Sequence, residues 1–169
     1  MKDRIELAKY FAELGFKTGA EIGVMEGSYS RALCMYNPEL KLYSIDGWEL
    51  LKDNNKRKKH QLWWYERAKN KLAPYNTTIV KKLSNEAVKQ FEDNSLDFVY
   101  IDANHTYQCV IEDTTIWTPK VRSGGIVSGH DYQLPDVKKA VDEYAVQHNY
   151  KLNITEEGNP SWWFVKKQQ

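Results

Sequence analysis

A strand-turn-helix segment with two spaced glycines limits most strongly what this chain can fold into. An apolar run from Gly19 to Val24 leads into a turn that contains Gly23 and Gly27, and a helix-like pattern follows the turn. Glycine tolerates positive φ and lets other groups approach bare backbone, while the first N–H groups of a helix lack partners within the helix. The segment therefore predicts a β-strand that feeds a helix whose N-terminus faces a ligand.

The charge beside this turn indicates which kind of cofactor it would accept. Glu21 and Glu26 place two carboxylates at the strand end and in the turn, where they would repel the pyrophosphate of a dinucleotide. S-adenosylmethionine (SAM) carries an ammonium and a sulfonium group at its amino-acid end, so it suits these acids better than NAD does. The segment also lacks the Gly-x-Gly-x-x-Gly spacing of dinucleotide sites, and Gly27-Ser28 lacks the Lys of a phosphate-binding loop.

The rest of the chain predicts alternating strands and helices. Strands are expected at 19–24, 41–45, 77–82, 96–101 and 125–128. Helices are expected at 5–14, 62–72, 86–91, 106–117 and 136–148, and a further helix, with Ser28 or Ser30 as its N-cap, is expected to end by residue 37. The 96–101 run is nearly continuously apolar and aromatic, as in a parallel strand buried on both faces. Residues 150–155 and 162–165 indicate an antiparallel hairpin. We expect one domain over residues 1–169, with a doubly wound, mostly parallel α/β sheet.

Length, charge and cysteine content narrow the class of protein. The 169 residues suffice for one domain, which would bury about 70% of the unfolded surface. The net charge of +1 with mixed signs gives no argument for nucleic acid or a membrane as partner, so we expect a small molecule. Cys34 and Cys109 are expected to be reduced thiols, and no apolar run approaches the ~18 residues of a membrane span. These features favour a cytoplasmic protein.

Polar side chains follow the expected strands, and parallel strands would bring them to one edge of the sheet. Asp46 follows the second strand, where a carboxylate can accept hydrogen bonds from both ribose hydroxyls of an adenine nucleotide. Trp48 either lies against the adenine ring or packs in the core. Ser84 and Asn85 either contact the adenine edge or cap the helix expected from Glu86.

Two further strand ends carry groups suited to catalysis. Asp102 and His105 lie three positions apart after the fourth strand, so a carboxylate and an imidazole can reach a common ligand. Methyl transfer needs the acceptor atom held in line with the methyl group and a base for its proton, and His105 fits the base unless it is structural. His130 and Asp131 follow the fifth strand. Together with Asp102 they would offer ligands to a divalent metal ion, or His130 would instead contact substrate.

Four blocks of the sequence resemble the class I SAM-dependent methyltransferases. The blocks are Glu21-Ile-Gly-Val-x-x-Gly27-x-x-Ser30, Ser44-Ile-Asp46-Gly-Trp48, the run from Leu96 to Tyr107 with Asp102-Ala-Asn-His105, and the run from Pro119 to Tyr132 with Gly129-His130-Asp131. Within that class the chain is similar to a small group of bacterial sugar and macrolide O-methyltransferases and cephalosporin-hydroxylase-like proteins. The resemblance implies a seven-stranded Rossmann-like sheet whose last strand is antiparallel.

The resemblance also implies roles for single residues. Glu21 would face the methionine amino group, the glycines would pass beneath the cofactor, and Asp46 would hold the ribose. Metal-dependent relatives use an acid at the position of Asp102 and a pair after the fifth strand, but here His130 stands where that pair begins with an acid. The expected cofactor-binding residues are Glu21, Gly23, Val24, Gly27, Ser28, Asp46, Gly47, Trp48, Ser84 and Asp102. The expected catalytic residues are Asp102, His105, His130 and Asp131, and the expected metal ligands are Asp102, His130 and Asp131.

We expect methyl transfer from SAM to a small acceptor, with a hydroxyl oxygen of a sugar-like or other small metabolite as the acceptor atom. One alternative is an NAD-dependent oxidoreductase on a similar sheet. Another is a non-catalytic cofactor-binding module that needs a partner, because only the 49–76 stretch and the first helix could close an acceptor pocket. A second copy in a homodimer would supply the missing wall. The run from Lys56 to Lys59 would steer an anionic substrate, form a lid or be a solvated face, and Glu26 has no expected role.

Overall fold

The computed structural model describes residues 1–48 and 55–168, with side chains described from His60 onward in the second range. The side chains of Lys56 to Lys59, for which a steering or lid role was considered, therefore lie outside the described residues. The helices are α1 (Arg4–Glu13), α2 (Ser28–Tyr36), α3 (Asn55–Leu72), α4 (Ser84–Ala87), α5 (Tyr107–Trp117) and α6 (Pro135–Gln147), with 3-10 turns η2 (Val88–Gln90) and η3 (Thr118–Lys120). The strands are β1 (Thr18–Ile22), β2 (Lys41–Asp46), β3 (Thr77–Lys81), β4 (Leu96–Ile101), β5 (Val121–Gly129), β6 (Asn153–Ile154) and β7 (Trp162–Val165).

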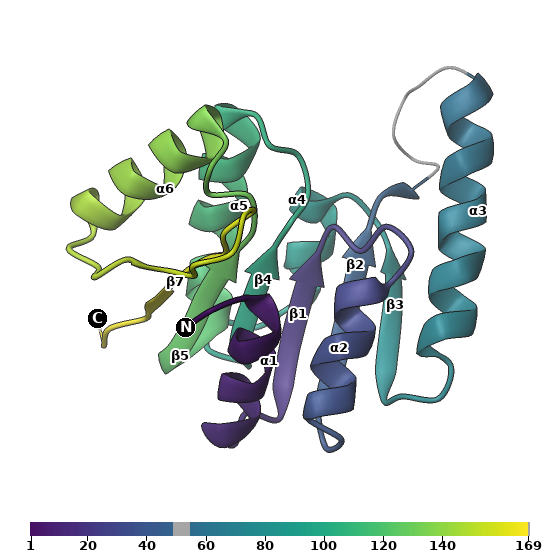
Figure 1. The fold of residues 1–169 in the computed structure, drawn as a ribbon, viewed down its shortest axis with the longest axis horizontal. Helices are drawn as coiled ribbons and strands as arrows, with labels where there is room; N and C mark the ends of the chain where they lie inside the picture. The colour runs from purple at the N-terminus through teal and green to yellow at the C-terminus, as the bar shows by residue number, and fades with distance from the viewer. Residues whose placement is uncertain (49–54, 169) are drawn as a thin grey trace.

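The seven strands form one sheet in the order β3-β2-β1-β4-β5-β7-β6. Neighbours among β1 to β5 are parallel, whereas β7 runs antiparallel to both β5 and β6. Figure 1 shows α1 and α2 in front of this sheet and α5 behind it. The predicted doubly wound, mostly parallel sheet with an antiparallel C-terminal hairpin is confirmed.

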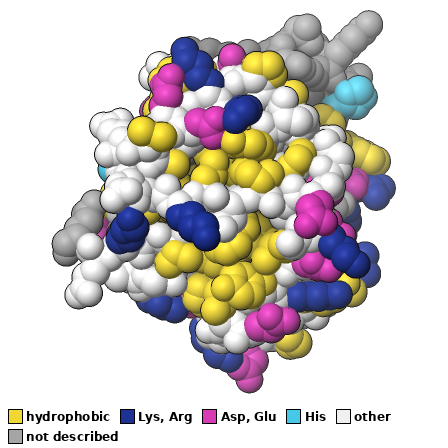
Figure 2. Space-filling model, turned by 60° about the vertical axis from the view of Figure 1, so that its left-hand side comes forward, with side chains coloured by type: hydrophobic (Ala, Val, Ile, Leu, Met, Phe, Trp, Pro, Cys, Tyr) yellow, Lys and Arg dark blue, Asp and Glu magenta, His cyan; other side chains and the backbone are white. Residues whose placement is uncertain are grey.

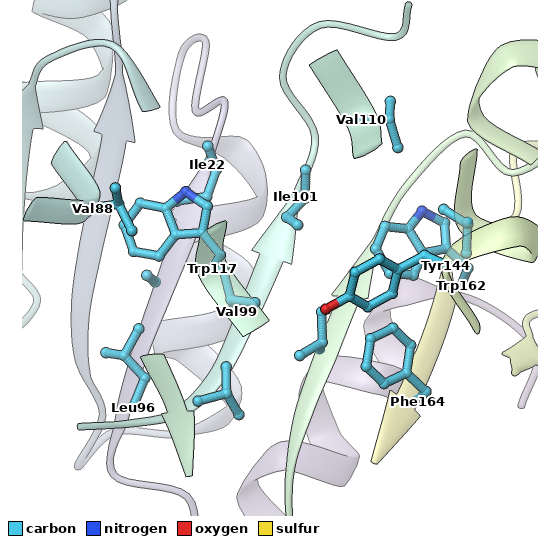
Figure 3. Close-up of a cluster of buried hydrophobic side chains, with 14 of the residues drawn as sticks. Ile22, Val88, Leu96, Val99, Ile101, Val110, Trp117, Tyr144, Trp162 and Phe164 are labelled. Carbon is cyan, nitrogen blue, oxygen red and sulfur yellow. The ribbon is translucent and has the colours of Figure 1, made fainter. Parts of the chain in front are cut away.

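The central strand β4 is buried on both faces, which explains why its sequence is apolar at every position except Asp97. Phe98 and Tyr100 pack in one core cluster with α1 and α2, where the Phe98 ring lies 4.3 Å from the ring of Phe11. Val99 and Ile101 point to the opposite face, into the cluster that α5, α6 and β7 complete (Figure 3). Each such side chain contributes about 1.5–3 kcal/mol through burial. Because β4 is anchored on both sides, the residues at its end are held in fixed positions.

Several predicted boundaries differ from the observed ones. Helix α3 begins at Asn55, seven residues before the predicted start, because its first two turns are polar and show no apolar period. Strand β5 begins at Val121 instead of 125, and its early part bonds to the chain after β7 through Lys166. Strand β6 is only two residues long. Helix α4 begins at Ser84 with Leu83 as its N-cap, so the prediction that Ser84 caps a helix from 86 is wrong.

The cysteines, the helices and one face of the surface bear on the expectations from composition. Cys34 and Cys109 are free, as predicted. None of the helices in the described ranges combines the length and apolarity that crossing a bilayer requires. Figure 2 shows apolar side chains gathered in the middle of one face, with basic and acidic side chains interspersed around them. That face therefore carries no field of a single sign.

Candidate active site

The ends of the parallel strands lie level at one edge of the sheet, where Figure 1 shows the arrowheads of β1, β2 and β4. Ile22 at the end of β1 pairs with Ile45 in β2 and with Ile101 in β4. Backbone bonds continue beyond the strands, from Asp102 N–H to the Ile22 carbonyl at 2.7 Å and from His130 N–H to the Ile101 carbonyl at 3.1 Å. The polar residues that follow the strands thus share one edge.

The loop after β1 depends on its two glycines. Gly23 has a φ of +90°, and a Cβ built on it would lie 2.1 Å from the carbonyl oxygen of Asp102. Only glycine lets the ends of β1 and β4 approach this closely. Gly27, at φ +79°, is the N-cap of α2 and makes no side-chain capping bond. The prediction that Ser28 or Ser30 caps this helix is wrong, because both serines lie inside its first turn and the left-handed glycine turns the chain before them.

Glu21 is a buried acid at the centre of this edge. Its side chain is 2% exposed and accepts a hydrogen bond from the Ser30 hydroxyl, which lies 2.8 Å from the Ser44 hydroxyl. Burial raises the pKa of Glu21 to about 8; the Ser30 bond and Arg4 oppose this increase, while Asp102 adds to it. The carboxyl is therefore mainly neutral at pH 7. A cation placed beside it would favour the carboxylate form.

Asp46 holds the glycine loop against the end of β2. Its Oδ2 accepts the N–H groups of Val24 at 2.9 Å and Met25 at 2.8 Å, and its Oδ1 accepts the N–H of Trp48 at 2.8 Å. Trp48 is 1% exposed, donates its indole N–H to the Met25 carbonyl at 2.8 Å, and meets the ring of Tyr65 edge-on. The packing alternative considered for Trp48 is thus present in the structure. Asp46 Oδ1 keeps a lone pair, and contacts with ribose or adenine stay predictions.

Ser84 joins α4 to α5. Its hydroxyl donates to Asp113 Oδ1 at 2.5 Å and accepts the indole N–H of Trp117 at 2.8 Å. Burial raises the pKa of Asp113 to about 6, against the opposing effect of the Ser84 bond. The observed role of Ser84 is structural, and its contact with an adenine edge stays a prediction. Gly47 is buried between Asp46 and Trp48.

The four residues expected to carry catalysis come together. His105 Nε2 lies 3.1 Å from Asp131 Oδ2 and 3.4 Å from Asp102 Oδ1. His130 Nδ1 lies 3.3 Å from Asp131 Oδ1 and 3.7 Å from Asp102 Oδ2. Asp131 adopts a φ of 57°, a conformation that is costly for residues with side chains and recurs at functional sites. The sequence placed these groups correctly because each directly follows a central parallel strand or opens the loop after it.

The contacts of His105 leave one ring nitrogen available. Both carboxylates lie at Nε2, and Nδ1 makes no hydrogen bond to any residue within the described ranges. The hydrogen bond with Asp102 raises the pKa of His105, and the charge of Asp131 adds to this, whereas partial burial opposes it. Carboxylates at Nε2 favour the tautomer with its proton there. Nδ1 is then a proton acceptor at the sheet edge.

The same group has the geometry of a metal site. One ligand atom each from Asp102, His105 and Asp131 lie within 4.8 Å of one another. Two oxygens and one imidazole nitrogen suit manganese, iron or zinc better than magnesium. This set shares Asp102 and Asp131 with the predicted ligands, with His105 in the place of His130. Metal binding stays a prediction.

Two contacts in this cluster come from distant parts of the chain and were not predicted. Arg4, in the first turn of α1, brings Nη1 to 3.9 Å from Asp102 Oδ2. Asn159, in the turn before β7, donates to Asp131 Oδ1 at 3.3 Å. Neither residue belongs to a local motif, so no pattern in the sequence pointed to them. The N-terminal helix and the C-terminal hairpin therefore complete the site that strand ends begin.

Glu26, which had no expected role, joins the glycine loop to α3. Its carboxylate lies 2.7 Å from Arg67 Nε and 3.2 Å from Lys71 Nζ. The hydrogen bond from Lys71 lowers the pKa of Glu26, and Ser28 contributes in the same direction. The second acid of the turn is thus occupied by cations of the protein. Glu21 remains as the acid available to a cationic ligand.

Comparison with known sequences identifies one family. A family model described as a methyltransferase domain matches residues 20–132. An uncharacterised protein of Acanthamoeba polyphaga mimivirus is 32% identical over 135 residues, which cover 75% of this chain and 58% of that protein. An uncharacterised protein of Sinorhizobium fredii is 21% identical over 132 residues, covering 75% of this chain and 14% of that protein. The chain thus spans less than two thirds of the length of these curated relatives.

Solved structures share the fold across nearly the whole chain. An O-methyltransferase from Bacillus cereus in complex with SAH, the demethylated product of SAM, is 13% identical with a TM-score of 0.70, covering 96% of this chain and 80% of that one. The O-methyltransferase TomG from Streptomyces achromogenes in complex with SAM is 15% identical with a TM-score of 0.72, covering 98% and 80%. At these identities the likeness establishes the fold.

Proposed function

The chain belongs to a family of methyltransferase domains, and we propose that it transfers a methyl group from SAM to a hydroxyl oxygen of a small acceptor. The observation that carries this proposal is the imidazole of His105 between Asp102 and Asp131, at the same edge as the buried acid Glu21. The candidate base His105 and the acid suited to the donor's ammonium, Glu21, thus share one edge of the sheet. The SAM and SAH complexes of proteins with this fold support the choice of donor.

The residues of the sheet edge fit the donor. Glu21 is buried and accepts one hydroxyl hydrogen bond, and no Lys or Arg of the described part of the chain lies within ion-pair distance of it. We assign it to the donor's ammonium, the backbone at Gly23 and Gly27 to the surface beneath the donor, and Asp46 Oδ1 to a ribose hydroxyl. When bound, SAM supplies an electrophilic methyl group, so the protein's main task is to align the acceptor oxygen with it.

His105 would act as the base for the acceptor. Its Nδ1 takes the hydroxyl proton as the oxygen attacks, and the imidazolium that forms is stabilised by the two carboxylates at Nε2. A positioned base of this kind contributes about 10²–10⁴-fold to the rate. Asp102 and Asp131 also fix the orientation of the ring, so that Nδ1 faces the acceptor.

A metal-assisted reaction is the second candidate, because ligand atoms of Asp102, His105 and Asp131 lie within 4.8 Å of one another. A divalent ion held there would lower the pKa of a bound acceptor hydroxyl, so that its proton could pass to solvent water without a protein base. The two candidates differ in their response to chelators. They agree on the donor and on the acceptor atom.

The acceptor, the partners and the location are part of the same proposal. We expect a small-molecule acceptor without a nucleic-acid or membrane partner, and a homodimer whose second copy closes the pocket, for which the apolar side chains in Figure 2 are the support. Light scattering would check the dimer. The free thiols Cys34 and Cys109 fit the expected cytoplasmic location.

The function is tested by donor binding and by turnover. Calorimetry with SAH should show one site per chain, and methyl-labelled SAM with a panel of sugar-like and phenolic acceptors should give a labelled ether. Failure of the folded protein to bind SAH or SAM would refute the proposal. Binding of SAH without turnover of any acceptor would favour the non-catalytic module that needs a partner.

A further inference from the structure

We propose that Arg4 binds the carboxylate of the donor's methionine moiety, an inference that rests on the proposed function. Arg4 lies in the first turn of α1, outside the segments that resemble methyltransferases. With Glu21 it would form a two-part site for a zwitterion, in which an acid binds the ammonium and a guanidinium binds the carboxylate. SAM and SAH carry both groups on the same carbon atom, so the two protein groups must be neighbours.

The guanidinium of Arg4 is held at the site but has no hydrogen-bond partner among the residues that the structure describes. Its side chain is 35% exposed and lies over the ring of Tyr29, with Cζ 5.3 Å from the ring centre. The nearest charged partner is Asp102, at 3.9 Å, which exceeds hydrogen-bond distance. No guanidinium N–H donates to any acceptor within the described residues. The five donors of this planar fork, whose geometry matches a carboxylate, are therefore available to a ligand.

The backbone around Arg4 is fixed by contacts with two other segments and by the N-cap of its own helix. Its N–H donates to Glu157 Oε1 at 2.8 Å, in the turn between β6 and β7. Its carbonyl accepts the hydroxyl of Tyr29 at 2.9 Å, and Asp3 caps the helix through the N–H groups of the next two residues. An arginine on such a rigid element loses little conformational freedom when a ligand binds. The guanidinium is thus prepared for an anion before the anion arrives.

The position of Arg4 favours the donor's carboxylate over an anionic group on the acceptor. Arg4 stacks on Tyr29 of α2, the helix that also carries Ser30, and Ser30 bonds Glu21. Burial raises the pKa of Glu21, and the Ser30 hydrogen bond and, to a lesser extent, the charge of Arg4 oppose this increase. The proposed base, His105, approaches Asp102 Oδ1 and Asp131 Oδ2, whereas Arg4 approaches Asp102 Oδ2. The acceptor belongs near His105, and the amino-acid end belongs near Glu21 and Arg4.

The test compares two ligands on the Arg4→Met variant. SAH carries both the ammonium and the carboxylate, whereas its decarboxylated analogue keeps only the ammonium. The affinity for SAH should fall about 10- to 100-fold, because a charge-assisted pair is lost, while the affinity for the analogue stays within about threefold of wild type. Arg4→Lys should fall in between, because it keeps the charge without the fork. Arg31→Met, an exposed arginine on α2, is the matched control and should leave both affinities unchanged.

The comparison of ligands separates this inference from the proposed function. Equal losses for SAH and for the analogue would overturn it, because they would mean that Arg4 acts through Asp102, Glu21 or the fold. Unchanged SAH affinity with a raised KM for an anionic acceptor would also overturn it. If wild-type protein bound neither ligand, the proposed function itself would fail. Thermal unfolding of each variant checks that the fold is intact.

Discussion

Replacing Glu21 with glutamine tests whether the buried acid is a proton-linked site for a cationic ligand. Burial raises the pKa of Glu21 from 4.5 to about 8, so the folded protein holds a proton on this carboxyl that the unfolded chain releases. Between these values the folded state binds more protons than the unfolded state. The free energy of unfolding therefore decreases as pH rises, by about 1.4 kcal/mol per pH unit.

The size of the effect follows from the two pKa values. From pH 5 to pH 8 the contribution of Glu21 to stability should fall by about 3.5 kcal/mol, and it should level off above the folded-state pKa. The glutamine side chain cannot ionise, so the difference in unfolding free energy between wild type and Glu21→Gln should change by that amount over this range. Urea unfolding at each pH measures the difference. Glu13→Gln, at an exposed glutamate of α1, is the control and should show no such trend.

The affinity for SAH should also depend on whether the Glu21 carboxyl carries its proton. If the ammonium of SAH requires ionised Glu21, the wild-type affinity should rise about tenfold from pH 6 to pH 7, and about 0.9 proton should be released per ligand at pH 7. Calorimetry in buffers of different ionisation enthalpy counts this proton. Glu21→Gln should bind weakly, with an affinity that changes little with pH. The reasoning would be refuted if the SAH affinity and the unfolding free energy of the wild type changed with pH in the same way as those of Glu21→Gln.

Three further predictions concern the cluster and the loop. His105→Gln should lower kcat by about 10²–10⁴-fold with unchanged SAH affinity, whereas an equal loss of SAH affinity would indicate a structural role. The wild-type kcat/KM should rise with pH through a value above 6.5, because the hydrogen bond with Asp102 raises the pKa of the His105 base, which must lose its proton before it can act. EDTA should leave turnover unchanged if His105 is the base, and loss of activity that manganese restores would favour the metal. Gly23→Ala should destabilise the protein by at least about 2 kcal/mol in urea unfolding, because its Cβ would meet the Asp102 carbonyl at 2.1 Å, whereas Gly158→Ala, which meets no atom within 4 Å, should not.

The sheet could be predicted where a local pattern coincides with burial. The bounds of β4 were predicted to the residue, because its run is apolar except for Asp97 and a strand buried on both faces differs clearly from the polar loops beside it. The polar first turns of α3 show no period, and its start was therefore missed. The early part of β5 was missed for a different reason. Its partner is the backbone near Lys166, more than forty residues away, and no local pattern encodes that pairing.

Some features of the candidate site could likewise be predicted from the sequence, and others could not. Asp102, His105, His130 and Asp131 could be predicted because parallel strands end at one edge, and each residue follows such a strand closely. The orientation of the His105 ring, with both carboxylates at Nε2, depends on side-chain packing between two loops. Such a detail has no counterpart in the order of residues.

Local sequence patterns specify the order of strands and helices, the glycine loop, and the set of acids and histidines at the strand ends. These follow from hydrophobic period, turn residues and the requirement that parallel strands end together. Tertiary contacts alone establish that Glu26 is neutralised by α3, that Glu21 is buried without an ion pair to any residue in the described ranges, and that Arg4 reaches the same edge from α1. Charge and solvation depend on which groups lie within a few ångströms of each other, and residues far apart along the chain set those distances.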